Sequence, residues 1–313
     1  MIVITGSLAF DHIMNFPGKF SDHIMPEKLH LLNVSFLVPQ MRKSFGGTAG
    51  NIAYNLALLG IKTTLFGVSG LDFAPYREFL KNNGVDTSKV KINNRCYTST
   101  AFGITDKDDN QIWGFYPGGD SMTHKLSVKN IREKIDFAVI APNNPKAMVK
   151  FAIEYQELGV PYLFDPGMQL RWFSGKNLLD AFSGAKIIIG NDYEVSFMEK
   201  LTGIRNLHDL SSKGKIVITT LGKDGSKISV LGKMINVKSA KAKKSLDPSG
   251  AGDAYRAGFI AGYMRGFKIK TCGQMGSLSA VYTVEKYGTT THHFTKKEFC
   301  QRYKENFGEE LNL

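Results

Sequence analysis

A run of small residues ends in an acidic side chain in DPSGAGD, residues 247–253. Gly250 and Gly252 let the backbone turn without a Cβ, so that amide groups can point at a ligand. The residues that follow predict a helix, and the free N–H groups and dipole at a helix start attract an anion. Asp253 would then place a carboxylate directly beside an anion hole.

These two features suit the two halves of a phosphoryl transfer. Helix N–H groups stabilise the charge of the moving phosphoryl group, and a nearby carboxylate accepts the proton of the attacking hydroxyl. A second interpretation is that Asp253 only caps the helix, which is worth about 0.5–1 kcal/mol. The spacing alone leaves both interpretations open.

Strand-like and helix-like segments alternate along most of the chain. Strand-like segments span residues 2–5, which form a short β-branched run, and 63–68. Four compact apolar segments without polar alternation, as expected when both faces of a sheet are covered, span residues 137–140, 161–164, 187–189 and 216–219. Helical patterns span residues 49–59, 74–83, 145–158, 176–182 and 193–201. The alternation predicts a single three-layer α/β/α domain over residues 1–313, with a mainly parallel sheet.

Two segments interrupt this alternation. Residues 12–44 hold scattered hydrophobic side chains and three prolines, and residues 98–116 predict a hairpin that turns at 107–110. We expect a small discontinuous β lid from about 11–44 and 94–118, placed over the carboxyl ends of the main strands. An ordinary edge hairpin is the alternative.

Composition is that of a globular protein, with 42% hydrophobic and 22% charged residues. Three cysteines without metal spacing favour a reducing, cytoplasmic setting. The start of the chain has no signal-peptide pattern, and no apolar run is long enough to span a membrane. The net charge is +12, but the basic residues are scattered, so we expect neither a nucleic acid nor a membrane as partner.

Four motifs in order carry a resemblance to a known family. DPSGAGD matches a DPxGxGD signature, and FGGTAGNIAYNLALLG (45–60), NDYE (191–194) and TLGKDG (220–225) match the other motifs of the ribokinase-like, or PfkB, carbohydrate kinases. Residues 6–38, NQIWGFYPGG and FDPGMQL resemble the branch of bacterial adenosine and nucleoside kinases. The resemblance implies phosphorylation of a nucleoside 5′-hydroxyl, adenosine to AMP, with ATP and Mg²⁺.

The resemblance also implies roles for individual residues. Asp253 would be the catalytic base, and the anion hole would consist of Gly250, Ala251 and Gly252. The nucleoside site would be lined by Ser7, Asp11, Ser35, Gly47, Asn51, Phe115, Gln169 and Arg171. The ATP side would be formed by Asn191, Glu194, Thr220, Gly222, Gly225 and Ser277. Glu194 would hold Mg²⁺ through water, and Asp247 and Ser249 would support a monovalent cation such as K⁺.

Some positions depart from the pattern of that branch. Met168 stands where a glutamine is expected, Arg171 is displaced, and an aromatic residue of the lid falls at Phe102, one position out of register. A one-residue slip turns a side chain to the other face of a strand, so the preferred base stays open. The alternatives are a sugar kinase of the same family, acting on ribose, fructose or a sugar phosphate, or a non-catalytic nucleoside-binding protein. We further expect a homodimer through the lid and an exposed His292-His293 pair.

Overall fold

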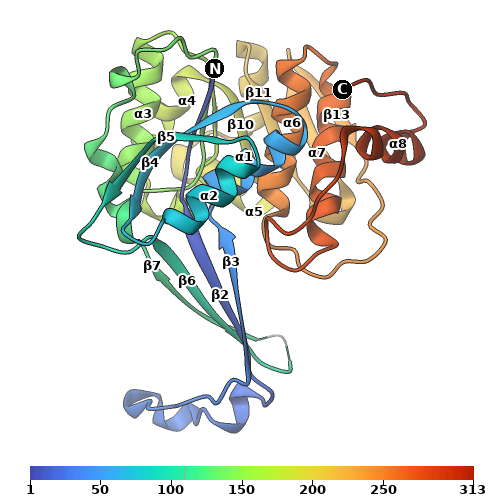
Figure 1. Cartoon of the computed structure of the whole chain (residues 1–313). Helices are drawn as coiled ribbons and strands as arrows, with labels where there is room; N and C mark the ends of the chain where they lie inside the picture. Colours follow the sequence, from blue (N-terminus) through green and yellow to red (C-terminus); the bar gives the residue numbers. More distant parts are fainter. Residues whose placement is uncertain (109) are drawn as a thin grey trace.

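A nine-stranded sheet runs through the middle of the molecule and carries helices on both faces (Figure 1). The computed structural model describes residues 1–108 and 110–313. Along the sheet, the strands follow the order β13-β12-β11-β10-β9-β8-β1-β4-β5. Their bounds are β1 Ile2–Thr5, β4 Thr63–Gly70, β5 Asp86–Asn93, β8 Phe137–Ile140, β9 Tyr162–Phe164, β10 Ala185–Asn191, β11 Ile216–Thr220, β12 Ser226–Val230 and β13 Lys233–Val237.

In this order, neighbouring strands from β11 across the sheet to β5 pair in parallel. At the other edge, β12 and β13 are added as antiparallel strands. The predicted α/β fold with a mainly parallel sheet is therefore confirmed. Parallel pairing places the carboxyl ends of these strands at one edge, which is where open α/β sheets bind ligands.

Two hydrophobic cores lie on the two faces of the sheet, because successive strand residues point in opposite directions. Ile2 and Ile4 belong to one core and Val3 belongs to the other. The first core is covered by α1 Thr48–Leu58, α2 Ala74–Asn82, α6 Ala251–Met264, α7 Ile269–Val284 and α8 Lys296–Phe307. The second core is covered by α3 Pro145–Glu157, α4 Gly175–Gly184 and α5 Asp192–Thr202.

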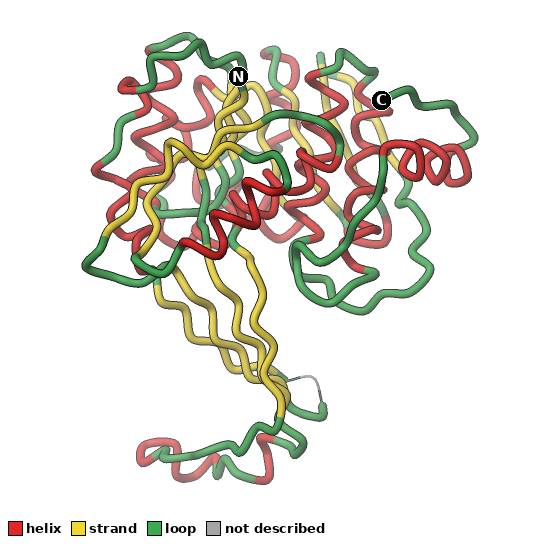
Figure 2. The backbone as a smooth tube through the Cα atoms, viewed as in Figure 1, coloured by secondary structure: helices red, strands yellow, loops and turns green. Residues whose placement is uncertain are grey.

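A second sheet, which we call the lid, projects from the main domain (Figure 2). It contains four strands in the order β3-β2-β6-β7, with bounds β2 Ala9–Asn15, β3 Gln40–Gly46, β6 Ser99–Thr105 and β7 Gln111–Tyr116. The two segments that interrupt the α/β alternation thus supply its strands. β6 and β7 pair as an antiparallel hairpin; its predicted turn at 107–110 includes Asp109, which lies outside the described residues.

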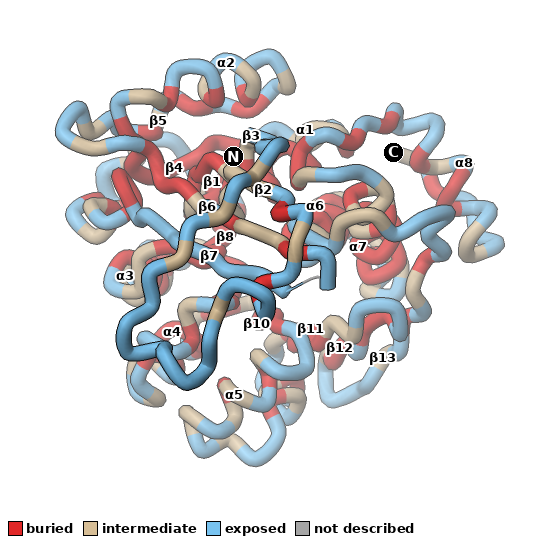
Figure 3. The backbone as a smooth tube through the Cα atoms, turned by 90° about the horizontal axis from the view of Figure 1, so that it is seen from below, coloured by how far each residue is buried: buried red, intermediate tan, exposed pale blue. Residues whose placement is uncertain are grey.

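Residues 16–39 connect β2 to β3, and we call them the arm. The arm lies at the end of the lid farthest from the main sheet (Figure 1), and it is mostly exposed (Figure 3). It contains two short 3-10 helices, Phe20–Asp22 and Pro26–Leu31. Within the part of the chain that the structure describes, no helix combines the length and the apolar character needed to cross a membrane.

Candidate active site

Asp253 lies in the first turn of α6, at the edge of the main sheet that carries the lid. The turn before it depends on Gly250, whose φ of 73° lies in the left-handed region that favours glycine. A Cβ at Gly250 would also approach the side chain of Thr289 to 2.9 Å. The Asp253 carboxylate is buried, and its Oδ2 accepts a hydrogen bond from Nδ2 of Asn51 at 2.8 Å. Two predicted site residues from distant parts of the sequence therefore meet.

The predicted anion hole lies at the start of the same helix. The first N–H groups of a helix have no partner within the helix. The N–H of Ala251 donates to the carbonyl of Pro248 at 3.2 Å, so this amide is already engaged. At Gly252, a Cβ would lie 2.6 Å from Nη1 of Arg256. Glycine at this position therefore leaves room for a guanidinium beside the hole.

Arg256 forms a buried ion pair with Asp165, which follows β9. The two side chains are 8% and 1% exposed. We assigned no role to either residue from the sequence. The available signals were the aspartate in FDPGMQL and the position of Arg256, three residues after Asp253 and so on the same side of the helix.

Acidic side chains dominate the charge of this region. Burial raises the pKa of Asp253 to about 6, and the Glu194 charge adds to this, while Arg256 and the Asn51 hydrogen bond lower it. Burial, followed by the charges of Asp253 and Asp247, raises the pKa of Asp11 to about 7. A carboxylate with a pKa just below neutral is suited to accept a proton at neutral pH.

Asp11 belongs to the lid face that carries two aromatic side chains. In the strand register Asp11 pairs with Ala101, and Ala101 pairs with Phe115, so these three residues share one face. Trp113 lies on the same face and covers Gly103. Sequence reasoning identified Phe115 but missed Trp113, although both are exposed aromatic residues at alternate positions of one strand.

Phe102 lies on the opposite face of the lid. It pairs with His12, and the two rings stack with their centroids 5.1 Å apart. The one-residue offset noted in the sequence therefore turns this aromatic ring away from Asp11.

The start of α1 gathers three predicted nucleoside contacts. Gly47 precedes the helix with a φ of 83°. The hydroxyl of Ser7 accepts the N–H of Thr48 at 3.0 Å, so Ser7 caps the helix. Oδ1 of Asn51 is buried without a hydrogen-bond partner among the described residues. The amide of Asn51 thus holds Asp253 with one atom and keeps an acceptor for a ligand hydroxyl.

A cavity of about 660 Å³ adjoins the predicted anion hole. Four residues of the predicted ATP side line it: Thr220, Gly222, Gly225 and Ser277. It also reaches Ala251 and Gly252 at the start of α6. The hydroxyl of Ser277 accepts the N–H of Ala240 at 2.7 Å, which fixes one wall. The arrangement connects a nucleotide-sized cavity to the amides beside Asp253.

Asn191 and Glu194 begin α5 and bind each other. The Asn191 side chain accepts the Glu194 N–H at 2.7 Å, and Oε2 of Glu194 accepts the Asn191 N–H at 2.8 Å. This is the capping box that a purely structural role predicts. The Glu194 charge nevertheless raises the pKa of both Asp165 and Asp253.

Three further predicted nucleoside contacts belong to other segments of the chain. Gln169 and Arg171 belong to the 3-10 helix Gly167–Trp172, where the exposed Arg171 lies 5.6 Å from the ring of Trp172. Ser35 belongs to the arm, at the far end of the lid (Figure 1).

The predicted cation residues form a turn. Oδ1 of Asp247 accepts the N–H of Ser249 and Oδ2 accepts the N–H of Gly288, both at 2.9 Å. Over residues 1–108 and 110–313, no group of three or more His, Cys, Asp or Glu side chains is arranged to hold a metal.

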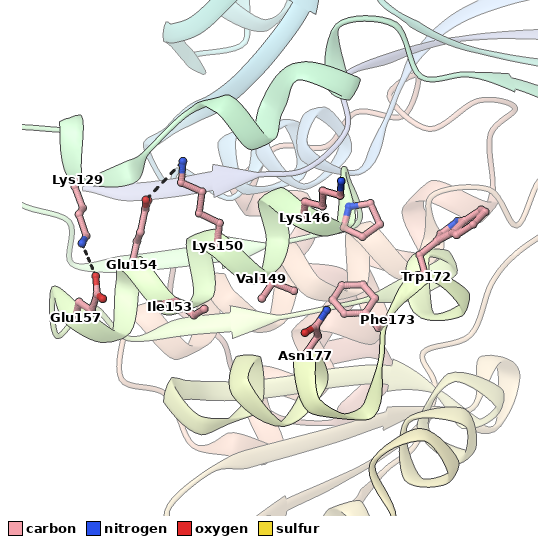
Figure 4. A pocket seen from close by; sticks show the side chains of 11 residues that line it. Lys129, Lys146, Val149, Lys150, Ile153, Glu154, Glu157, Trp172, Phe173 and Asn177 are labelled. Atoms are coloured by element: carbon pink, nitrogen blue, oxygen red, sulfur yellow. Dashed lines mark ion pairs between the residues drawn. The ribbon is translucent and has the colours of Figure 1, made fainter.

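A separate groove of about 580 Å³ lies on the outer side of α3 and α4 (Figure 4). None of the predicted site residues lines it. Two of its lysines, Lys129 and Lys150, pair with Glu157 and Glu154 (Figure 4). Each of these two lysines is neutralised by a glutamate, and Lys146 is the third lysine of the lining.

A buried carboxylate at a helix start, beside a nucleotide-sized cavity and beneath a lid, defines a phosphotransferase with an alcohol as acceptor. The model of the "pfkB family carbohydrate kinase" matches residues 7–296. The chain belongs to this family.

Relatives of known name extend the comparison. The chain is 32% identical over 317 residues to a nucleoside kinase of Methanothermobacter thermautotrophicus, an alignment that covers 99% of this chain and 97% of the relative. A nucleoside kinase of Methanocaldococcus jannaschii is 31% identical, with 97% of each chain covered. The structure of the Burkholderia thailandensis nucleoside kinase in complex with inosine superposes with a TM-score of 0.89 at 34% identity, covering 99% of both chains.

Proposed function

We propose that this chain is an ATP-dependent nucleoside kinase that phosphorylates the 5′-hydroxyl of a purine nucleoside, converting adenosine to AMP in purine salvage. The observation that carries the proposal is the buried Asp253 carboxylate, held by Asn51 at the start of α6 beside the cavity of Thr220 and Ser277. A solved relative was crystallised with ADP and inosine, which supports a purine nucleoside as acceptor and ATP as donor.

In this mechanism Asp253 accepts the proton of the 5′-hydroxyl while its oxygen attacks the γ-phosphorus. The free amides at the start of α6 stabilise the charge of the transferring group. Asp11 and the free Oδ1 of Asn51 accept hydrogen bonds from the ribose hydroxyls. Phe115 and Trp113 lie on the Asp11 face of the lid, which supports a role for their rings in contacting the base.

The acidic cluster suits a hydrated Mg²⁺ that arrives with the nucleotide. The charge of Glu194 raises the pKa of both Asp165 and Asp253, the charge of Asp253 also raises that of Asp165, and the Arg256 guanidinium lowers both. Oδ1 of Asp165 is buried without a hydrogen-bond partner among the described residues. Oxygen donors with excess negative charge fit this hard cation, which neutralises phosphate charge when bound. A K⁺ site at Asp247 and Ser249 stays a prediction.

The outer face of the lid supports the proposed homodimer. Four large apolar side chains lie on the face opposite Asp11 and are 42–61% exposed: Met41, Phe102, Ile112 and Tyr116. Exposed apolar patches of this kind mark interaction surfaces. A second copy that presents the same face would cover them by two-fold symmetry.

The proposal is tested with the purified protein and a panel of adenosine, inosine, guanosine, cytidine, ribose, fructose and fructose 6-phosphate, assayed for ATP consumption. We expect turnover of purine nucleosides. Turnover of sugars alone would favour a sugar kinase, and nucleoside binding without ATP consumption would favour a binding protein.

The Asp253→Asn variant tests the assignment of the base. Its kcat should fall roughly 10²–10⁴-fold, as is typical when a general base is lost, while the nucleoside Kd stays near that of the wild type. Asp120→Asn is the matched control, because Asp120 is also a buried aspartate with a raised pKa and should keep its kcat. A near-wild-type kcat in Asp253→Asn would refute the assignment.

A further inference from the structure

The lid is tied to the main domain by the loop that follows α7. The hydroxyls of Thr289 and Thr290 both donate to the carbonyl of Phe45 in β3, at 3.0 and 3.3 Å. Farther along the same strand, the guanidinium carbon of Arg42 lies 4.4 Å from the ring centroid of Tyr287. One loop therefore contacts β3 at two levels, by hydrogen bonds near its base and by a cation–π contact toward the arm.

Arg42 lies on the lid face that carries Asp11. In the register of β2 and β3, Asp11 pairs with Ser44 and Ile13 pairs with Arg42, so alternate positions place these side chains together. Arg42 and Tyr287 both line a cavity of about 970 Å³ between the lid and the main domain. Tyr287 is 53% exposed and belongs to neither hydrophobic core, so the contact can open without exposing either core.

The same loop supports the start of α6. The N–H of Gly288 donates to Asp247, whose other carboxylate oxygen accepts the N–H of Ser249. Thr289 packs so closely on Gly250 that a Cβ there would lie 2.9 Å away. A shift of the loop therefore moves the backbone that forms the anion hole. The chain of contacts runs from the lid through residues 287–289 to the helix start.

We propose that Arg42 and Tyr287 form a latch that positions the lid over the acceptor and couples the lid position to the anion hole through residues 287–289. In this proposal Arg42 and Tyr287 act as positioning residues. The proposal rests on the proposed function for the roles of Asp11 and the anion hole. The latch does not depend on which nucleobase the acceptor carries.

The test uses the full chain with Tyr287→Leu, Tyr287→Phe, Arg42→Gln and the Arg42→Gln/Tyr287→Leu double variant. An exposed cation–π contact corresponds to about a two- to fivefold effect. We expect Tyr287→Leu and Arg42→Gln each to raise the Kd and KM for adenosine by this factor. The double variant should show no further loss, and Tyr287→Phe, which keeps the ring, should behave as the wild type. The Kd for ATP alone should not change.

A second measurement does not depend on a ligand. The chain has two tryptophans, Trp113 and Trp172, and Trp113 lines the same cavity as Tyr287. In a Trp172→Phe background, acrylamide quenching of Trp113 should increase with Tyr287→Leu but not with Tyr287→Phe. Tyr97→Leu is the matched control, since Tyr97 is 59% exposed and precedes β6; it should leave both readouts unchanged.

Equal losses in Tyr287→Phe and Tyr287→Leu, additive losses in the double variant, or unchanged quenching would overturn the latch. If Tyr287→Leu fails to fold, Arg42→Gln alone tests the latch by the Kd and KM for adenosine and by the quenching of Trp113. If the wild type binds and phosphorylates no nucleoside, the proposed function fails, and Trp113 quenching still decides whether the latch holds the lid.

Discussion

Asn51 on α1 and Asp253 on α6 are 202 positions apart in the sequence, and their side chains meet at 2.8 Å. This hydrogen bond counteracts the effect of burial on the carboxylate, because it favours the ionised form. The residue that holds the proposed base therefore also helps to lower the pH at which this carboxyl ionises.

Replacing Asn51 by Leu should move the acid limb of the kcat profile to higher pH. The pKa of Asp253 is already raised to about 6. A hydrogen bond to a charged group contributes about 1.5–3 kcal/mol, so its loss should raise the pKa by roughly 1–2 units. Activity requires the deprotonated base, so the variant should lose most activity between pH 6 and 7 and recover part of it near pH 9. Initial rates at saturating substrates from pH 5 to 9 measure this.

Asn55→Leu is the control for loss of a buried amide from the same helix. The Asn55 side chain binds His292 and the carbonyl of Asn51 rather than Asp253. The Asn55→Leu variant should lower the free energy of unfolding without moving the acid limb of the kcat profile. An acid limb that stays in place in Asn51→Leu would show that this hydrogen bond does not tune the base.

Arg256→Met should destabilise the protein and raise the pKa of Asp253. The ion pair with Asp165 is almost fully buried, and removal of one partner leaves an uncompensated charge, which costs about 3–5 kcal/mol. The Asp165→Asn/Arg256→Met double variant should recover part of this loss because the unpaired carboxylate is gone. Urea denaturation measures the free energy of unfolding, and the pH profile reports the pKa of the base.

Arg302→Met is the matched control. Arg302 of α8 also forms an ion pair, in which its two terminal nitrogens donate to Glu285 at 2.9 and 2.6 Å. Its loss should lower stability and leave the acid limb unchanged. If the double variant were no more stable than Arg256→Met, the unpaired Asp165 charge would not be the cause of the destabilisation.

Much of the main fold could be predicted because its signals are local. The apolar runs at 2–5 and 137–140 coincide with β1 and β8, since central parallel strands need apolar side chains on both faces. β10 was placed at 187–189 but extends over Ala185–Asn191, because Lys186 and Asn191 interrupt the apolar run at its ends. The motif order identified the family for the same reason, since each motif is a contiguous stretch.

Contacts between distant segments were not accessible in this way. The expectation that His292 is exposed was wrong: it is 1% exposed, and its Nε2 lies 2.9 Å from Oδ1 of Asn55, 237 positions away. The pairing of Asp165 with Arg256 has no local signal either. Which lid residues share a face with Asp11 depends on the pairing of strands, which a one-residue offset inverts. Trp113 is different, because its alternation with Phe115 within one strand was visible in the sequence.

Asp120 lies in the 3-10 helix Gly118–Lys125. Its burial predicts a pH dependence of stability that is independent of catalysis. Burial raises its pKa to about 7, although Thr123 and the backbone of Asn144 donate to it and lower it. The unfolded chain ionises this group near pH 4. The folded state therefore binds a proton that the unfolded state has lost, and the associated stability declines as the pH rises from 4 to 7.

Asp120→Asn keeps the shape of the side chain and removes the charge. The variant should match the wild type near pH 4 and become more stable than it above pH 7, by a difference of up to about 4 kcal/mol. Urea denaturation at pH 4.5, 6 and 8 measures this difference. Asp136→Asn provides the exposed control. The N-terminal ammonium lowers the pKa of Asp136, so Asp136→Asn should not become more stable than the wild type as the pH rises. A constant difference between Asp120→Asn and the wild type across this range would mean that Asp120 stays ionised in the folded protein.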